Sequence, residues 1–200
     1  MRRLVVLVAV LALVGMVQAQ IVPIGSFTGQ KQEGFETQPR YQFLFEYDVF
    51  GGGGNKVQTL GGGQGLHITS GWSFFYVTYP HGGEVFMGGA GVNANWIFAT
   101  PALKFGGYFN TNADVPDATA LFYDSNNNLM ATLGVTAPIG GQWAWNGWET
   151  QGAGIKRVEI VAKNQYQGFI MHDDMEYTAI PEPATLALLG LGGLALLRRR

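Results

Sequence analysis

The chain has 200 residues, of which 12 are basic, 14 are acidic and none is cysteine. The lack of cysteine excludes a disulfide framework, a thiolate zinc site, a cysteine nucleophile and a lipid-modified N-terminal cysteine. The acidic balance, with no cluster of lysine and arginine in the body of the chain, argues against nucleic acid as a partner.

The N-terminus has the three parts of a secretory signal. Arg2 and Arg3 form a positive start, and residues 4–17 are apolar apart from one glycine. The small-residue ending Val17-Gln18-Ala19 is a suitable site for a signal peptidase. We therefore predict a signal helix over residues 1–19 that is removed on export; the alternative is a retained N-terminal anchor.

Residues 20–179 are long enough to form one domain with its own core. Five of the arginines and Glu182 lie in the terminal segments, which leaves seven basic and thirteen acidic residues in the body of the chain. Glycine occurs 30 times, about twice its usual share of ~7%. We predict an all-β passenger domain, an antiparallel β-sandwich of the jelly-roll type, because short alternating segments recur between turn signals.

Alternating apolar residues indicate the individual strands. Residues 125–128 (Ser-Asn-Asn-Asn) form a hairpin-turn signal, since asparagine tolerates a positive φ. Four glycine-rich runs are interpreted as connections or edges between strands. The predicted strands are at residues 41–49, 66–76, 103–109, 121–123, 129–133, 158–162 and 169–177, and the glycine-rich runs are at 51–54, 61–65, 88–91 and 140–141.

Two groups of side chains in this body are candidate sites. By strand parity Asp173 shares the core-facing phase of Met171 and Met175, so its carboxylate needs a hydrogen bond, a metal ion or a bulge that turns it outward. Trp143, Trp145 and Trp148 are a candidate sugar-binding platform, because aromatic faces stack on sugar rings. The alternative is that Trp143 and Trp145 share a strand face and pack in the core.

The C-terminus has a second three-part pattern. Pro181-Glu182-Pro183 precedes an apolar run over residues 184–197, and Arg198, Arg199 and Arg200 end the chain. Fourteen helical residues extend roughly 21 Å, against a hydrocarbon core of about 30 Å. We predict a transmembrane helix within residues 180–200 that crosses with help from its flanks, with the arginines as its cytoplasmic stop.

This tail resembles the PEP-CTERM sorting signal. The resemblance covers about the last tenth of the chain and includes all three parts in order. It implies that Pro181, Glu182 and Pro183 are recognised by a membrane-embedded exosortase and cleaved nearby. It also implies passage through the inner membrane to the cell surface or the extracellular matrix.

The body resembles exported jelly-roll domains, among them PEP-CTERM passenger domains whose last strand carries Asp-Asp. In that class a first-strand Phe-Glu and the last-strand Asp-Asp lie together, often around structural calcium. The resemblance implies that Glu36 and Asp173 are neighbours and could hold Ca²⁺, which oxygen ligands suit.

We expect a non-catalytic surface or matrix protein, with exopolysaccharide as a candidate partner. The alternative is a carbohydrate-binding jelly-roll module with structural calcium. A third reading is a secreted hydrolase, with acids such as Glu149, Asp114 and Asp117, although paired catalytic acids require a fixed separation that the sequence does not supply.

Overall fold

The computed structural model describes residues 20–181, and the regular structure in this range consists entirely of β-strands. The predicted all-β class is therefore confirmed. The strands are β1 (Ile21–Ile24), β2 (Lys31–Glu33), β3 (Phe43–Leu44), β4 (Glu46–Asp48), β5 (Lys56–Leu60), β6 (Gly65–Thr69), β7 (Trp72–Ser73), β8 (Val77–Thr78), β9 (Phe86–Ala90), β10 (Asn93–Thr111), β11 (Ala118–Tyr123), β12 (Leu129–Val135), β13 (Ala144–Thr150), β14 (Ile155–Ala162) and β15 (Ile170–Ala179).

The predicted signal helix at 1–19 lies outside the described residues, as do Glu182, Pro183, the apolar run and Arg198 to Arg200. Within residues 20–181, no helix has the length and apolar character needed to cross a bilayer.

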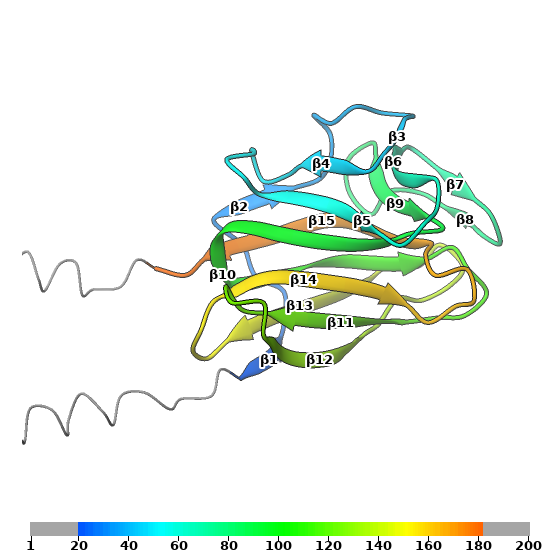
Figure 1. The fold of residues 1–200 in the computed structure, drawn as a ribbon. Helices are drawn as coiled ribbons and strands as arrows, with labels where there is room; N and C mark the ends of the chain where they lie inside the picture. The colour runs from blue at the N-terminus through cyan, green and yellow to red at the C-terminus, as the bar shows by residue number, and fades with distance from the viewer. Residues whose placement is uncertain (1–19, 182–200) are drawn as a thin grey trace, which may run out of the picture.

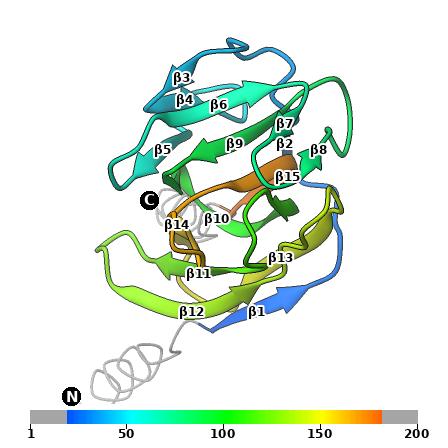
Figure 2. The ribbon, with the colours of Figure 1, turned by 90° about the vertical axis from the view of Figure 1, so that its right-hand side faces the viewer.

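The long strand β10 joins the two layers of the sandwich. Its first part, residues 93–97, pairs with β5 and β14, and its last part, residues 104–111, pairs with β13 and β15. The register shifts between Ile97 and Ala102, where the strand turns from one layer into the other. Figure 1 shows this bend at the left-hand end of the molecule, and Figure 2 shows the layers from the side. One layer thus contains β12-β11-β14-β10-β5-β4, and the other contains β1-β13-β10-β15, continued by β9-β6-β3, with β2 also paired to β15.

Aromatic side chains fill the space between the layers. Trp96, from the first part of β10, contacts Phe105 from its second part, with ring centroids 5.4 Å apart. Phe122 of β11 and Trp148 of β13 meet across the layers at 5.2 Å. All four side chains are buried, and aromatic rings of this size dominate the energetics of a core.

Three predictions about local structure can be compared with the strands. The hairpin is confirmed: β11 and β12 are joined by residues 124–128, and Asn127 has φ 63°. The long strand predicted at 41–49 is wrong, because Tyr41 has φ 60° and only the short β3 and β4 form there. The glycine-rich run at 88–91 is also not simply a connection, since Gly88 and Gly89 lie in the buried strand β9.

Gly88 explains why a glycine-rich segment forms this buried strand. A Cβ on Gly88 would lie 2.4 Å from the sulfur of Met171 and 2.9 Å from the ring of Trp72. The glycine therefore lets neighbouring side chains pack directly on the backbone, rather than providing flexibility.

Both ends of the described chain leave the sandwich at the end where β10 bends (Figure 1). The backbone N–H of Ile180 donates to the carbonyl of Pro101 at 2.8 Å, which fixes the last residues to the bend. The β7–β8 hairpin lies at the opposite end (Figure 1). The described chain therefore begins and ends at the same end of the domain.

Candidate functional site: an aromatic cleft beside the last strand

A bulge in β15 decides which side chains face the core. Asp174 and Met175 together oppose the single residue Gly107 of β10, and Asp174 has φ 44°. His172 lies in the core, with its ring 5.6 Å from Trp96 and 5.1 Å from Phe109. The prediction that Asp173 and Met175 face the same side of the strand is therefore wrong. Before the bulge, His172 and not Asp173 points into the core.

Asp173 is nevertheless completely buried, beneath the segment 81–85. Its Oδ2 accepts hydrogen bonds from the backbone N–H groups of His81 at 2.7 Å and Gly82 at 3.2 Å. Burial, followed by the neighbouring charge of Asp174, raises the pKa of Asp173 from 3.8 to about 7, and the N–H donors oppose this rise. The carboxylate anchors the segment at a cost in desolvation.

Glu36 holds the other end of the same segment. Its Oε1 accepts from the backbone N–H of Glu84 at 2.6 Å and of Val85 at 3.2 Å. The preceding strand β2 pairs with β15, and Glu33 lies opposite Met175. The expected proximity of Glu36 to the last strand thus has a structural basis, with the segment 81–85 lying between Glu36 and Asp173.

The donor set around these two carboxylates does not fit a calcium ion as it stands. Calcium requires six to eight oxygen ligands, whereas the neighbours of Asp173 and Glu36 are N–H groups. Within residues 20–181, no group of three or more acidic or histidine side chains has a metal-binding arrangement. Calcium binding remains a prediction from the sequence, which calorimetry with Ca²⁺ would test.

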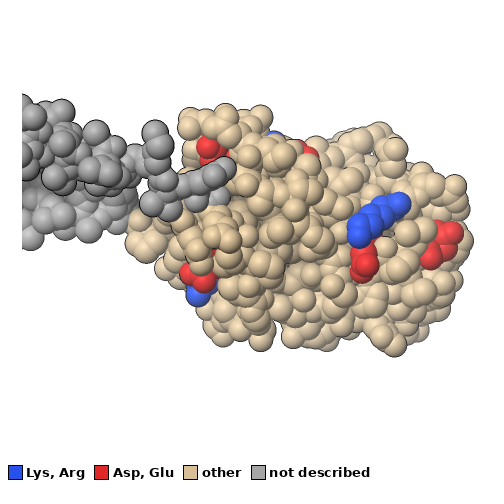
Figure 3. All heavy atoms as spheres, turned by 90° about the horizontal axis from the view of Figure 1, so that it is seen from below, with Lys and Arg blue, Asp and Glu red and all other residues tan. Residues whose placement is uncertain are grey.

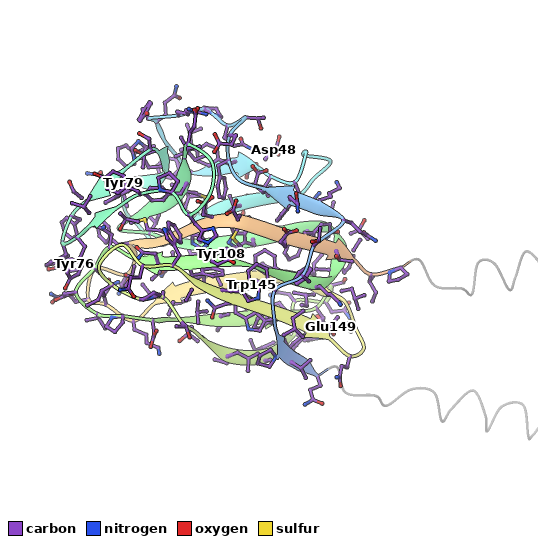
Figure 4. All side chains as sticks on the ribbon, turned by 180° about the vertical axis from the view of Figure 1, so that it is seen from behind. Asp48, Tyr76, Tyr79, Tyr108, Trp145 and Glu149 are labelled. Atoms are coloured by element: carbon purple, nitrogen blue, oxygen red, sulfur yellow. The ribbon has the colours of Figure 1, made fainter. Side chains whose placement is uncertain are left out.

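A cleft of about 370 Å³ lies on the outer face of the layer that contains β13, β10 and β15. One side is aromatic and consists of Phe27, Trp145 and Tyr108. Phe27 and Trp145 meet edge to face at 5.7 Å, and Trp145 and Tyr108 at 5.4 Å. Figure 4 shows Tyr108 and Trp145 beside one another on this face. The three half-buried rings form a continuous row along one side of the cleft.

Two paired glycines let the Trp145 ring lie close to the sheet. Gly106 of β10 pairs with Gly147 of β13. A Cβ on Gly147 would lie 2.8 Å from the indole Nε1 of Trp145, and one on Gly106 would lie 3.0 Å from its Cζ2. The indole N–H also donates to the carbonyl of Ile24 at 3.4 Å. The ring position is therefore set by the backbone around it and does not depend on a ligand.

The opposite side of the cleft is polar and comprises Gln32, Glu33, Asp174 and Glu176. Glu176 accepts from the backbone N–H of Gly29 at 2.7 Å and from Gln32 Nε2 at 2.9 Å. Asp174 Oδ2 lies 2.6 Å from His81 Nδ1, and the His81 ring stacks on Tyr108 at 3.5 Å. Aromatic rings and fixed hydrogen-bonding groups thus face the same space.

The structure separates the three tryptophans of the predicted platform. Trp145 lines the cleft, and Trp143 is half-buried beside it with its indole N–H donating to the carbonyl of Tyr79 at 3.0 Å. Trp148 points the other way and is 2% exposed in the core. The alternative reading, in which Trp143 and Trp145 pack in the core, is wrong because both rings are half-buried. Trp148 faces the core, and alternation along β13 puts Trp145 on the opposite face.

The sequence reasoning missed Phe27, Tyr108 and Asp174 as parts of this cleft. Tyr108 lies between the core residues Phe105 and Phe109 in the sequence. Because strand residues alternate between faces, its even position already indicated that it points away from the core. The acids considered for catalysis lie elsewhere: Glu149 pairs with Lys104 at 3.8 Å, and Asp117 accepts from the N–H of Ala137 at 3.1 Å.

A second hollow of about 510 Å³ lies near the β7–β8 hairpin. Phe74 stacks on Phe169 at 4.4 Å and is 50% exposed. Trp72 and Tyr166 also line it, together with a glycine-rich floor. Its lining lacks the carboxylate groups of the first cleft.

Figure 3 shows how charge is distributed on one face of the domain. Lysine and arginine side chains stand singly within a mostly uncharged surface. Elsewhere, Arg40 pairs with Glu36 and Glu84 at 3.0 and 2.9 Å. Paired and scattered basic groups of this kind differ from the continuous basic surface that binds a phosphate backbone.

Comparison with known families identifies the tail. Residues 179–200 match the PEP-CTERM protein-sorting motif. The chain is thus a β-sandwich protein that ends in a C-terminal sorting signal. The PEP-CTERM motif is consistent with an exosortase substrate and implies export with passage through the membrane.

Comparisons of the whole domain give only distant likenesses. The K2 cleaved adhesin domain of Lys-gingipain shares 17% identity over 74% of this chain and 97% of its own, with a TM-score of 0.46. The CBM22-1 xylan-binding domain of Paenibacillus barcinonensis Xyn10C shares 12% identity over 78% and 99%, with a TM-score of 0.45. A search of curated proteins finds no significant match.

Proposed function

We propose that the chain is an exported, exosortase-processed surface or matrix protein whose β-sandwich binds polysaccharide in the cleft formed by Phe27, Trp145 and Tyr108. The observation that carries the proposal is the Trp145 ring, held close to Gly106 and Gly147 beside fixed polar groups. Rigid aromatic rings supply contact area at a low cost in conformational entropy, and fixed polar groups orient the ligand.

The proposed role is binding rather than catalysis. The carboxylates around the cleft already have structural partners: Glu33 accepts from the N–H groups of Phe35 and Phe50, and Glu176 from Gly29 and Gln32. Burial raises the pKa of Glu33 above its ordinary value. These bonds hold the walls of the cleft in place, which suits a preorganised binding surface.

Replacing Trp145 with alanine is expected to weaken polysaccharide binding at least tenfold, because the largest apolar surface in the cleft is removed. Affinity electrophoresis of residues 20–181 in gels containing soluble polysaccharides would measure this, since the range holds every described strand and the core. The matched control is Phe74→Ala, which removes an exposed ring from the second hollow. Equal retention of the wild type and Trp145→Ala, or a loss confined to Phe74→Ala, would refute the assignment of the cleft.

The sorting route leads to a separate prediction. Replacing Glu182 with alanine in an exosortase-containing host is expected to leave unprocessed chain in the membrane fraction, because the Pro-Glu-Pro element is altered. Immunoblots of membrane, surface and medium fractions would show this, with an exosortase-deficient host as the reference. Normal shortening and release of Glu182→Ala would argue against processing at this element.

A further inference from the structure

The cleft is lined by acidic side chains, and this charge bears on which polysaccharide it can bind. Glu33, Asp174 and Glu176 line it, and the described residues that line it include no lysine or arginine. Lys104 lies over the Phe27 ring at 5.9 Å, and Glu149 pairs with its ammonium group at 3.8 Å. The polar wall of the cleft is therefore a source of negative potential.

Asp174 is the carboxylate best placed to meet a ligand. The bulge in β15 turns it out of the core, and 40% of its side chain is exposed. Its Oδ2 contacts His81, whose ring continues the aromatic row through Tyr108. Glu33, by comparison, is 7% exposed, and both of its oxygens accept backbone hydrogen bonds.

From this arrangement we infer that the cleft selects a polysaccharide rich in amino sugars with free ammonium groups. A sugar ring stacked on Trp145 places its substituents toward the wall that carries Asp174 and Glu176. An ammonium group gains from these carboxylates and from the faces of the aromatic rings, whereas the carboxylate of a uronic acid is repelled. This inference rests on the proposed polysaccharide binding and adds the ligand class.

Calorimetric titration of residues 20–181 at pH 6 and low salt tests the inference with tetramers of glucosamine, in β-1,4 and β-1,6 linkage. The comparison ligands are their N-acetylated counterparts, cellotetraose and a galacturonate tetramer. The best glucosamine tetramer is expected to bind at least tenfold more tightly than its N-acetylated form, and the galacturonate tetramer least tightly. High salt is expected to reduce the preference, because charge–charge interactions at an open cleft are screened.

Asp174→Asn separates charge from shape. Asparagine tolerates the positive φ of the bulge, so the variant should fold and lose most of the preference for glucosamine tetramers over their N-acetylated counterparts. The control Asp48→Asn, on an exposed residue away from Tyr108 and Trp145 (Figure 4), should keep the preference.

The outcomes distinguish the two proposals. If neutral and amino-sugar tetramers bind equally in a Trp145-dependent manner, the ligand class is wrong and the proposed function stands. The ligand class is also wrong if Asp174→Asn keeps the full preference. If no tetramer binds, both the ligand class and the polysaccharide-binding function are contradicted.

Discussion

Replacing Trp148 with alanine is expected to lower the free energy of unfolding by about 3–5 kcal/mol, the range for removing a large aromatic side chain from a core. The indole is 2% exposed and contacts Phe105, Phe109 and Phe122 at ring distances of 6.2, 6.0 and 5.2 Å. Truncation leaves a cavity between the two layers that these rings cannot close without moving β10 or β11.

Trp145→Ala is the matched control, because it removes the same side chain from the same strand on the opposite face. Its expected cost is about 1 kcal/mol, typical of a half-buried position. Urea unfolding followed by circular dichroism would measure both variants. Similar losses for the two variants would contradict the assignment of Trp145 to the cleft and Trp148 to the core.

The pH dependence of stability is expected to reveal two opposed buried groups on β15. Burial lowers the pKa of His172 to about 3 and raises that of Asp173 to about 7. Between about pH 4 and 6.5 the unfolded chain binds more protons at position 172, so His172 makes stability rise with pH. Over the same interval the folded chain binds more protons at position 173, so Asp173 makes stability fall with pH. The two contributions therefore largely cancel in the wild type.

Asp173→Asn removes one side of this balance. Relative to the wild type, the variant is expected to lose about 3 kcal/mol of stability as the pH falls from 6.5 to 4, from a slope of about 1.4 kcal/mol per pH unit. His172→Phe should change relative stability in the opposite direction, gaining as the pH falls. Urea titrations at several pH values in a buffer with a metal chelator would measure both. Parallel pH curves for all three proteins would refute the two buried titrations.

The sequence predicted the class of fold because apolar and polar residues alternate along every strand that has one buried face. The hairpin at 124–128, the strand β14 and the last strand were all visible in this way. The bend in β10 could not be predicted, because the alternation of side chains along a strand does not show where the strand leaves one layer and continues in the other. The buried glycines of β9 were misread for a related reason, since glycine contributes space to packing and carries no hydrophobic signal.

The cleft was only partly predictable from the sequence. Trp143 and Trp145 were noted as a pair, but which face of β13 points outward depends on the register with β10. Phe27 reaches the cleft from the segment after β1, 118 positions before Trp145. Asp174 faces the cleft only because of a bulge, whose extra residue inverts the parity of everything beyond it. The residues that line the cleft are therefore determined by the pairing register of distant strands and by the bulge, and neither can be inferred from a local sequence pattern.

The measurement that tests the central claim most directly is an NMR titration of the indole N–H signals of residues 20–181 with the oligosaccharide that binds most tightly. The chain has five tryptophans, which single substitutions can assign. The signal of Trp145 is expected to move with increasing ligand, while those of the core residues Trp96 and Trp148 stay in place. Movement confined to Trp72, which lines the second hollow, would contradict a polysaccharide-binding cleft at Phe27, Trp145 and Tyr108.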